Sequence, residues 1–229
     1  MSNPGFGATS RQRARTSAVA ASQLAETYLC LGRPGDAFAE MDLALRAAPP
    51  SEAGQVLAWR GAFNLWLGRY EEALPLLDEA CRLDAQCAFC WKAATLLKLG
   101  KPKPALELLD LTLERYPLDF EALVWRGEAK RALGRPKDAL KDLDRVPPAV
   151  GLWALFNRAL AKEALKDHKG MRAAFDAIPA FVVAYIRKRT GLPLSSPPAA
   201  SEMKAVLAAG LSLSHGFRRE EYRQAIWMR

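Results

Sequence analysis

Apolar and small residues recur along this chain in columns that lie about 34 residues apart. The most regular marker is a Leu-Gly pair, which stands at residues 31–32, 67–68, 99–100 and 133–134. A fifth copy, Leu165-Lys166, has lost its glycine. A period of this length is typical of a stack of repeated structural units.

Three further columns keep a fixed distance from the second residue of this pair. Seven residues before it the residue is small in every copy: Ala25, Gly61, Ala93, Gly127 and Ala159. Five residues after it stand Ala37, Ala73, Ala105, Ala139 and Met171. Nine residues after it stand large apolar residues: Met41, Leu77, Leu109, Leu143 and Phe175. Because the fifth copy keeps these columns, we count five units.

Each unit has two runs of helical periodicity around a short turn such as GRP, GRY or GKP, which predicts a helix-turn-helix pair. Glycine suits the end of the first helix because it adopts the left-handed backbone conformation without a Cβ clash. The small column lets the second helix approach closely, and Pro49, Pro117 and Pro147 end second helices. We therefore expect an all-α fold, with the leucine before each turn in the core.

The turn glycine, the small column, the alanine and the late proline resemble the tetratricopeptide repeat family over roughly residues 17 to 180. The resemblance implies a right-handed superhelical solenoid of about five antiparallel helix pairs. It also implies a concave groove, lined by the first helices, that binds peptides or other proteins. The departures from the family pattern are the bases Arg60, Lys92, Arg126 and Arg158, where the family more often has an apolar residue, and Lys166.

The flanks of the array predict the rest of the organisation. Residues 1–15 read as a disordered basic arm, and residues 16–190 as the array, in which 181–189 form a capping helix. Proline and serine make 191–200 a linker, and 201–229 an amphipathic helical tail. Because an exposed apolar groove is rare on a monomer, we expect either a partner or this tail to fill it.

Charge and composition narrow the class of partner. The net charge of +8 comes from the two flanks, because residues 16–180 balance at zero, so nucleic acid is an unlikely partner of the array. There is no run of 18 apolar residues to cross a membrane and no secretory signal, so we expect a cytoplasmic protein.

Two constellations invite a chemical reading, and neither is complete. Cys87-x-x-Cys90 with Cys81 lacks a fourth metal ligand nearby, and His168 beside Asp167 lacks a nucleophile or a second carboxylate. We predict no catalytic residue, no metal, no cofactor and no small-molecule substrate.

The groove that the resemblance implies is largely apolar. Trp59, Trp91 and Trp125 share one column and should form a ladder, which either packs adjacent repeats together or grips a proline-rich or cationic segment. A carboxylate clamp is not expected, because only Lys98 and Arg131 resemble one. The predicted partner-binding residues are Trp59, Ala62, Leu65, Trp66, Cys90, Trp91, Ala94, Leu97, Val124, Trp125, Glu128, Arg131, Phe156 and Leu160.

A column of aspartates lies ten residues after each turn and suggests either a cation site or a set of ion pairs. A base stands eight residues before the turn in every repeat except the first, which has Leu24 there. Because the first repeat has no predecessor in the array, we expect each base to pair with the aspartate of the preceding repeat. The predicted pairs are Asp42 with Arg60, Asp78 with Lys92, Asp110 with Arg126, Asp144 with Arg158, and Asp176 with Lys188 or Arg189.

Together these features predict a non-catalytic scaffold that binds a partner helix or peptide in an apolar concave groove. The alternative is a substrate-recruiting module of a longer enzyme, whose catalytic domain lies outside this chain.

Overall fold

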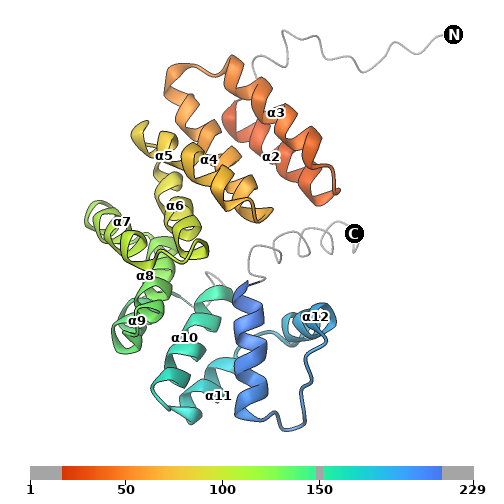
Figure 1. Cartoon of the computed structure of the whole chain (residues 1–229), viewed down its shortest axis with the longest axis vertical. Helices are drawn as coiled ribbons and strands as arrows, with labels where there is room; N and C mark the ends of the chain where they lie inside the picture. Colours follow the sequence, from red (N-terminus) through yellow and green to blue (C-terminus); the bar gives the residue numbers. More distant parts are fainter. Residues whose placement is uncertain (1–16, 148–151, 213–229) are drawn as a thin grey trace, which may run out of the picture. The chain divides into compact units, whose positions relative to one another are not determined.

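The computed structural model describes residues 17–147 and 152–212, and all of their regular structure is helical (Figure 1). This confirms the predicted all-α class. The helices are α2 (Ala18–Cys30), α3 (Pro34–Ala47), α4 (Pro50–Trp66), α5 (Tyr70–Arg82), α6 (Gln86–Lys98), α7 (Pro102–Arg115), α8 (Phe120–Ala132), α9 (Pro136–Leu143), α10 (Leu152–Ala164), α11 (His168–Asp176) and α12 (Ala180–Thr190). A further helix covers residues 200–212. The chain divides into two compact units, and the boundary in the sequence lies between Thr95 and Leu96.

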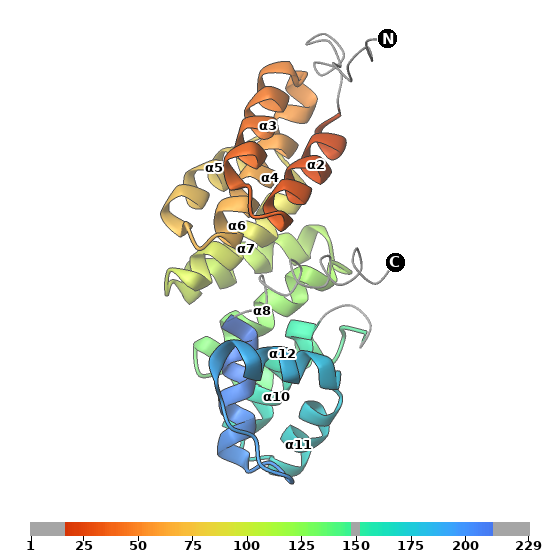
Figure 2. The same ribbon diagram turned by 90° about the vertical axis from the view of Figure 1, so that its right-hand side faces the viewer.

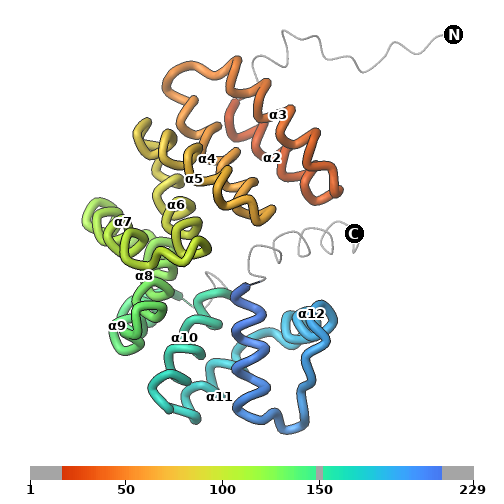
Figure 3. The backbone as a smooth tube through the Cα atoms, viewed as in Figure 1, coloured from red at the N-terminus to blue at the C-terminus, as the bar shows by residue number. Residues whose placement is uncertain are grey.

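The first unit contains helix pairs of the predicted kind. Helix α2 packs on α3 and α4 packs on α5, and α4 also contacts both helices of the first pair (Figure 3). The core between them includes Met41 from α3 and Val56 and Phe63 from α4, all fully buried. Burial of such side chains stabilises the stack by roughly 1.5 to 3 kcal/mol each.

The turn residue of each repeat has the backbone conformation that the glycine column predicts. Gly32, Gly68, Gly100 and Gly134 have φ between 69° and 77°. Lys166 has the same left-handed conformation, with φ of 59°, although a Cβ is disfavoured there. The fifth turn therefore keeps its geometry without glycine.

The two central columns face one another inside each helix pair. The side chains of Leu77 and Leu143, nine residues after their turns, are fully buried. A Cβ added to Gly61 would lie 2.6 Å from Leu77 Cγ, and one added to Gly127 would lie 2.8 Å from Leu143 Cγ. The small column is therefore small because a leucine of the second helix fills the space beside it.

The prediction that the leucine before each turn belongs to the core is wrong for the first repeat and is met only in part in the others. Leu31 is 63% exposed, whereas Leu67, Leu99 and Leu133 are half-buried. Leu67 packs against the core of the preceding helix pair. Within the described part of the chain Leu31 has no preceding pair to cover it, which explains the difference.

The second unit ends in a helix that folds back onto the array. Met203, Val206, Leu207 and Leu211 from residues 200–212 are buried in one cluster with side chains of α10, α11 and α12. Lys204 Nζ lies 2.8 Å from Glu163 Oε1, while Gly210 lies against Phe156, nearer the start of α10. The helix therefore runs antiparallel to α10, and it lies beside α10 in both views (Figures 1 and 2).

The start of this helix is fixed by one carboxylate. Glu202 accepts hydrogen bonds from Ser195 Oγ at 2.5 Å and from the Ala199 backbone N–H at 2.8 Å. These bonds lower the pKa of Glu202 below its usual value, the serine hydroxyl contributing most. The segment before residue 200 is thereby tied to the helix it precedes.

Candidate protein-binding face

The tryptophans of the first helices contact one another within each unit. Trp59 and Trp91 have ring centroids 4.9 Å apart in the first unit, which confirms that step of the predicted ladder. In the second unit Trp125 stacks on Trp153 at 6.5 Å and 21°. The step from Trp91 to Trp125 passes from one unit to the other and stays a prediction. Trp153 lies outside the predicted column, and its stacking on Trp125 was not predicted from the sequence.

Most of the predicted groove residues lie below the surface. Trp59, Trp66, Leu97 and Arg131 are half-buried. The others are buried: Ala62, Leu65, Cys90, Trp91, Ala94, Val124, Trp125, Glu128, Phe156 and Leu160. The surface that the first helices offer at these positions is therefore made of large aromatic, aliphatic and cationic side chains.

A buried polar chain links two of the predicted residues through a third that the sequence did not single out. Asn157 of α10 is fully buried and donates from Nδ2 to Glu128 Oε2 at 3.2 Å. Its Oδ1 accepts a hydrogen bond from Arg131 Nε at 3.1 Å. Asn157 stands in the fifth repeat at the position that holds tryptophan in the three repeats before it. This replacement is the feature of the sequence that could have pointed to Asn157. Glu128 and Arg131 of α8 are thereby oriented against α10.

The fold-back helix covers part of the predicted groove. Gly210 lies so close to Phe156 that an added Cβ would be 2.8 Å from its ring, and Leu160 belongs to the same buried cluster. Residues 201–212 of the predicted tail therefore pack on α10 beside two of the predicted groove residues, and the expectation that the tail fills the groove stays a prediction. Its remaining part, 213–229, lies outside the described residues, as does the predicted arm at 1–15.

The predicted ion pairs form at four of five positions. Arg60 and Asp42 approach to 2.8 Å, Lys92 and Asp78 to 2.8 Å, Arg126 and Asp110 to 3.0 Å, and Arg158 and Asp144 to 3.3 Å. The pairs confirm that each base contacts the preceding repeat. Among the described residues Asp176 has no ion pair, so its predicted partner in the cap is wrong. The aspartate column is therefore a set of repeat-to-repeat contacts rather than a cation site.

An aspartate outside every column forms a well-buried pair of ion pairs. Asp142 of α9 is 4% exposed at its side chain, and its carboxylate accepts from Arg126 Nη2 at 2.6 Å and from Lys130 Nζ at 2.7 Å. Burial alone would lower the pKa of Arg126, but hydrogen bonds to Asp142 and Asp110 raise it above its usual value. Arg126 therefore bridges its own second helix to the preceding one.

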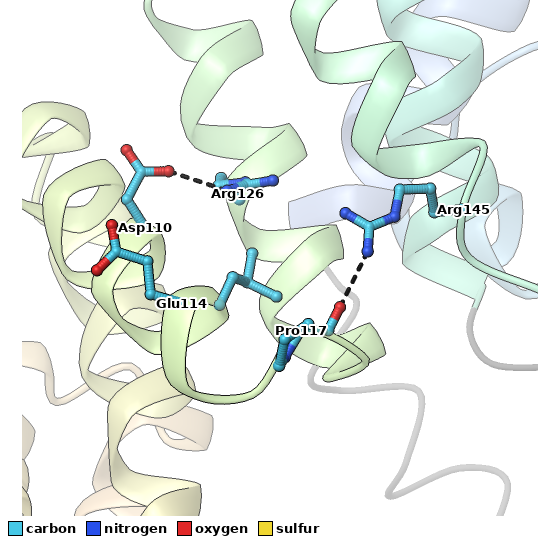
Figure 4. Close-up of a pocket in the computed structure, with 6 residues that line it drawn as sticks. Asp110, Glu114, Pro117, Arg126 and Arg145 are labelled. Atoms are coloured by element: carbon cyan, nitrogen blue, oxygen red, sulfur yellow. Dashed lines mark hydrogen bonds and ion pairs between the residues drawn. The ribbon is translucent and has the colours of Figure 1, made fainter.

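A pocket of about 320 Å³ lies on the second unit (Figure 4). It is lined by Asp110, Leu113, Glu114, Pro117, Arg126 and Arg145. Arg126 is held by Asp110, and Arg145 Nη2 donates to the Pro117 carbonyl at 3.0 Å, as the dashed lines show. Its two carboxylates balance its two guanidiniums, so the charges favour no class of ligand.

The histidine and cysteine side chains that could take part in catalysis or bind a metal do not form a site together. His168 is an exposed residue at the start of α11, and the neighbouring Asp167 caps that helix by accepting from the Gly170 N–H at 2.8 Å. All four cysteines are free thiols, and Cys30 and Cys90 are buried. Over residues 17–147 and 152–212 no group of three or more His, Cys, Asp or Glu side chains is arranged to hold a metal ion.

Cys81 should be unreactive at neutral pH. Burial raises its pKa to about 11, and the nearby Lys92 offsets only part of that rise. At pH 8 about one thiol in a thousand is then a thiolate, which is the reactive form. In a variant with Cys30, Cys87 and Cys90 replaced by alanine, iodoacetamide labelling of Cys81 should speed up about tenfold per pH unit until near pH 11. A rate that levels off near pH 9 would contradict this.

Comparison with known proteins supports a repeat fold. Residues 92–150 match the family described as tetratricopeptide repeat, and no curated protein sequence matches the chain. A tetratricopeptide repeat protein from Parabacteroides merdae ATCC 43184 has a TM-score of 0.57 and 17% identity, covering 92% of this chain and 79% of that one. The MamA RS-1 ArsTM double mutant has a TM-score of 0.53 and 22% identity, covering 70% and 92%.

A third structure, YrrB, is described as a TPR protein with an unusual peptide-binding site, and has a TM-score of 0.49 with 22% identity, covering 72% of this chain and 86% of its own. At these identities the likeness extends to the fold alone. None of the helices in the described ranges is both long and apolar enough for a membrane span. The helix pairs and the columns between them, together with the family match over residues 92–150, show that the chain is a helical repeat protein similar in fold to tetratricopeptide repeat proteins.

Proposed function

We propose that the chain is a protein-interaction scaffold whose first helices hold a helix or peptide of a partner protein. Repeat folds of this kind are used mainly to present extended binding surfaces to other proteins.

The observation that carries the proposal is the fold-back helix on α10. It buries four apolar side chains of residues 200–212 against the face where partner contacts are predicted, including Phe156. A face that accepts one amphipathic helix of its own chain has the shape and polarity to accept another on a neighbouring repeat. Leu97, half-buried on the first helix α6, is proposed as a contact of that kind.

A pair of matched leucine substitutions tests the proposal. Leu97→Asp places a charge on a first helix, whereas Leu111→Asp places the same charge on the second helix α7, where Leu111 is 64% exposed. With partners captured by the full chain from its source organism, Leu97→Asp should weaken binding about thirtyfold, as loss of a central contact does. Leu111→Asp should change it less than threefold. Melting curves of both variants provide the control for folding.

The opposite order would contradict the proposal. Binding that survives Leu97→Asp and is lost with Leu111→Asp would move the partner to the second helices. Recovery of no protein partner at all would remove the scaffold function itself.

A further inference from the structure

The outer side of α2 corresponds to a surface that is buried in every later repeat. The positions twelve and five residues before the turn hold Val56 and Phe63 in α4, and both side chains pack into the core of the preceding helix pair. In α2 the same positions hold Ala20 and Thr27, and both are exposed. The side of α2 that corresponds to a contact between repeats is therefore open within the described residues.

This open side of α2 is largely apolar and uncharged. The residues that share it, called the α2 stripe below, are Ala20, Gln23, Leu24, Thr27 and Leu31. Leu24 is 41% exposed and Leu31 is 63% exposed. The Thr27 hydroxyl donates to the Gln23 backbone carbonyl at 2.9 Å, so it keeps a partner when water is displaced. A terminal repeat that faces water needs a polar outer side, and the α2 stripe carries no charge to provide one.

A further repeat of the same pattern does not match the α2 stripe. In the later repeats a base stands eight residues before the turn and pairs with the preceding repeat, as Arg60 does with Asp42 at 2.8 Å. In α2 this position holds Leu24. An aspartate placed against Leu24 would lose water and gain no cation, which is unfavourable. The occupant of the stripe should therefore be apolar where it meets Leu24.

We propose that the α2 stripe binds the α2 stripe of a second copy of the chain, with the two helices antiparallel. Because the stripe has no charged side chain, two copies meet there without burying an unpaired charge. Other segments of the chain match it less well. Residues 1–16 offer three arginines and one aromatic residue, and residues 213–229 carry six charged residues. The inference goes beyond the proposed function, because the dimer needs no other protein.

The size of the stripe determines the strength of the pair. Helix α2 has 13 residues and is therefore about 20 Å long. One helix face on each copy buries less than the roughly 1,200 Å² of total area at which stable complexes begin. We therefore expect a weak dimer, with a dissociation constant of roughly 10 to 100 μM. Each copy has a net charge of +8, so the measurement is made in about 0.3 M salt, which screens the repulsion between copies.

Sedimentation velocity of the full chain over a concentration series tests the proposal. The natural chain should change from monomer to dimer as its concentration rises. Leu24→Arg gives α2 the kind of residue that the other repeats carry at this position, and it should weaken the dimer at least tenfold, because two cations then meet in the contact. Leu111→Arg is the matched control, since Leu111 is 64% exposed on α7 of the second unit. It should leave the dissociation constant within about twofold.

A mixture of two variants tests the symmetry of the contact. Leu24 lies at the middle of α2, so it should lie next to the twofold axis and meet Leu24 of the second copy. Leu24→Glu alone should weaken the dimer as Leu24→Arg does. An equimolar mixture of the two variants should associate at least tenfold more tightly than either variant alone. Melting curves control for folding, and Leu31→Arg replaces Leu24→Arg if the latter melts at a much lower temperature.

Several results would overturn the proposal. A natural chain that stays monomeric throughout the series would leave the α2 stripe to residues 213–229 or to another protein. A dimer that Leu24→Arg leaves unchanged would place the contact elsewhere on the chain. A mixture that associates no more tightly than its components would contradict a twofold contact at Leu24. If partners depend on Leu97 while the chain is monomeric, the scaffold function stands and this inference falls.

Discussion

Replacing Asp142 by alanine is expected to lower the free energy of unfolding of the second unit by about 3 to 5 kcal/mol. The carboxylate is 4% exposed and joins Arg126 and Lys130, whose side chains are 17% and 13% exposed. Removal of the Asp142 carboxylate leaves two cations close together in a site that water reaches poorly. Leaving a buried charge without a partner costs more free energy than the intact pair contributes to stability. For this reason the expected effect is large.

Asp110→Ala provides a matched control for this prediction. Asp110 contacts the same Arg126 at 3.0 Å, but its side chain is 50% exposed. Water replaces an exposed carboxylate readily, so its loss should cost only about 0 to 1 kcal/mol. Urea unfolding followed by circular dichroism measures both values. Equal losses in the two variants would show that burial of Asp142 is not the source of its contribution.

Replacing Leu143 by alanine should cost about 2 to 5 kcal/mol, because the leucine is fully buried and a cavity would remain in its place. The structure also predicts where that cavity lies. A Cβ at residue 127 would be 2.8 Å from Leu143 Cγ, so Gly127→Ala alone should destabilise the unit by overpacking, by about 1 to 3 kcal/mol.

The two changes should compensate each other when they are combined. In Leu143→Ala the alanine methyl at residue 127 enters free space, so Gly127→Ala should cost nothing there or stabilise the protein. Also, alanine favours a helix interior over glycine by roughly 1 kcal/mol. A double-mutant cycle measured by urea unfolding gives the coupling between the two sites. Strict additivity would show that α8 and α9 do not meet at these residues.

The repeat columns predicted the helix pairs because their spacing is a property of the chain alone. Each column places one type of residue at the same height in every helix pair. A small residue such as Gly61 on the first helix therefore indicates a large residue such as Leu77 packed against it from the second helix. The same reasoning predicted the pair of Arg60 with Asp42, because a base missing only from the first repeat indicates a contact with a predecessor. The pattern did not predict the exposure of Leu31, which no preceding helix pair covers within the described residues.

Contacts between helices were predicted less well where they are made by residues that break the columns. Asp142 stands eight residues after its turn, where other repeats carry residues such as Leu76 and Leu108, so no pattern points to it. Asn157 replaces a tryptophan and connects Glu128 to Arg131 across two helices. Such contacts depend on which side chains meet between repeats, and spacing along one repeat does not contain that information.

The sequence by itself determined the class of fold, the length of the repeat and the positions of its turns, because helical periodicity and the left-handed turn residue act within a few neighbouring residues. Tertiary structure decided which first-helix side chains keep an accessible surface, and it placed residues 200–212 over Phe156. It also decided that Lys166 adopts φ of 59° in the fifth turn. The physical reason is that burial and backbone strain depend on the free energy of all the surrounding packing, which outweighs a local cost of about 1 to 2 kcal/mol.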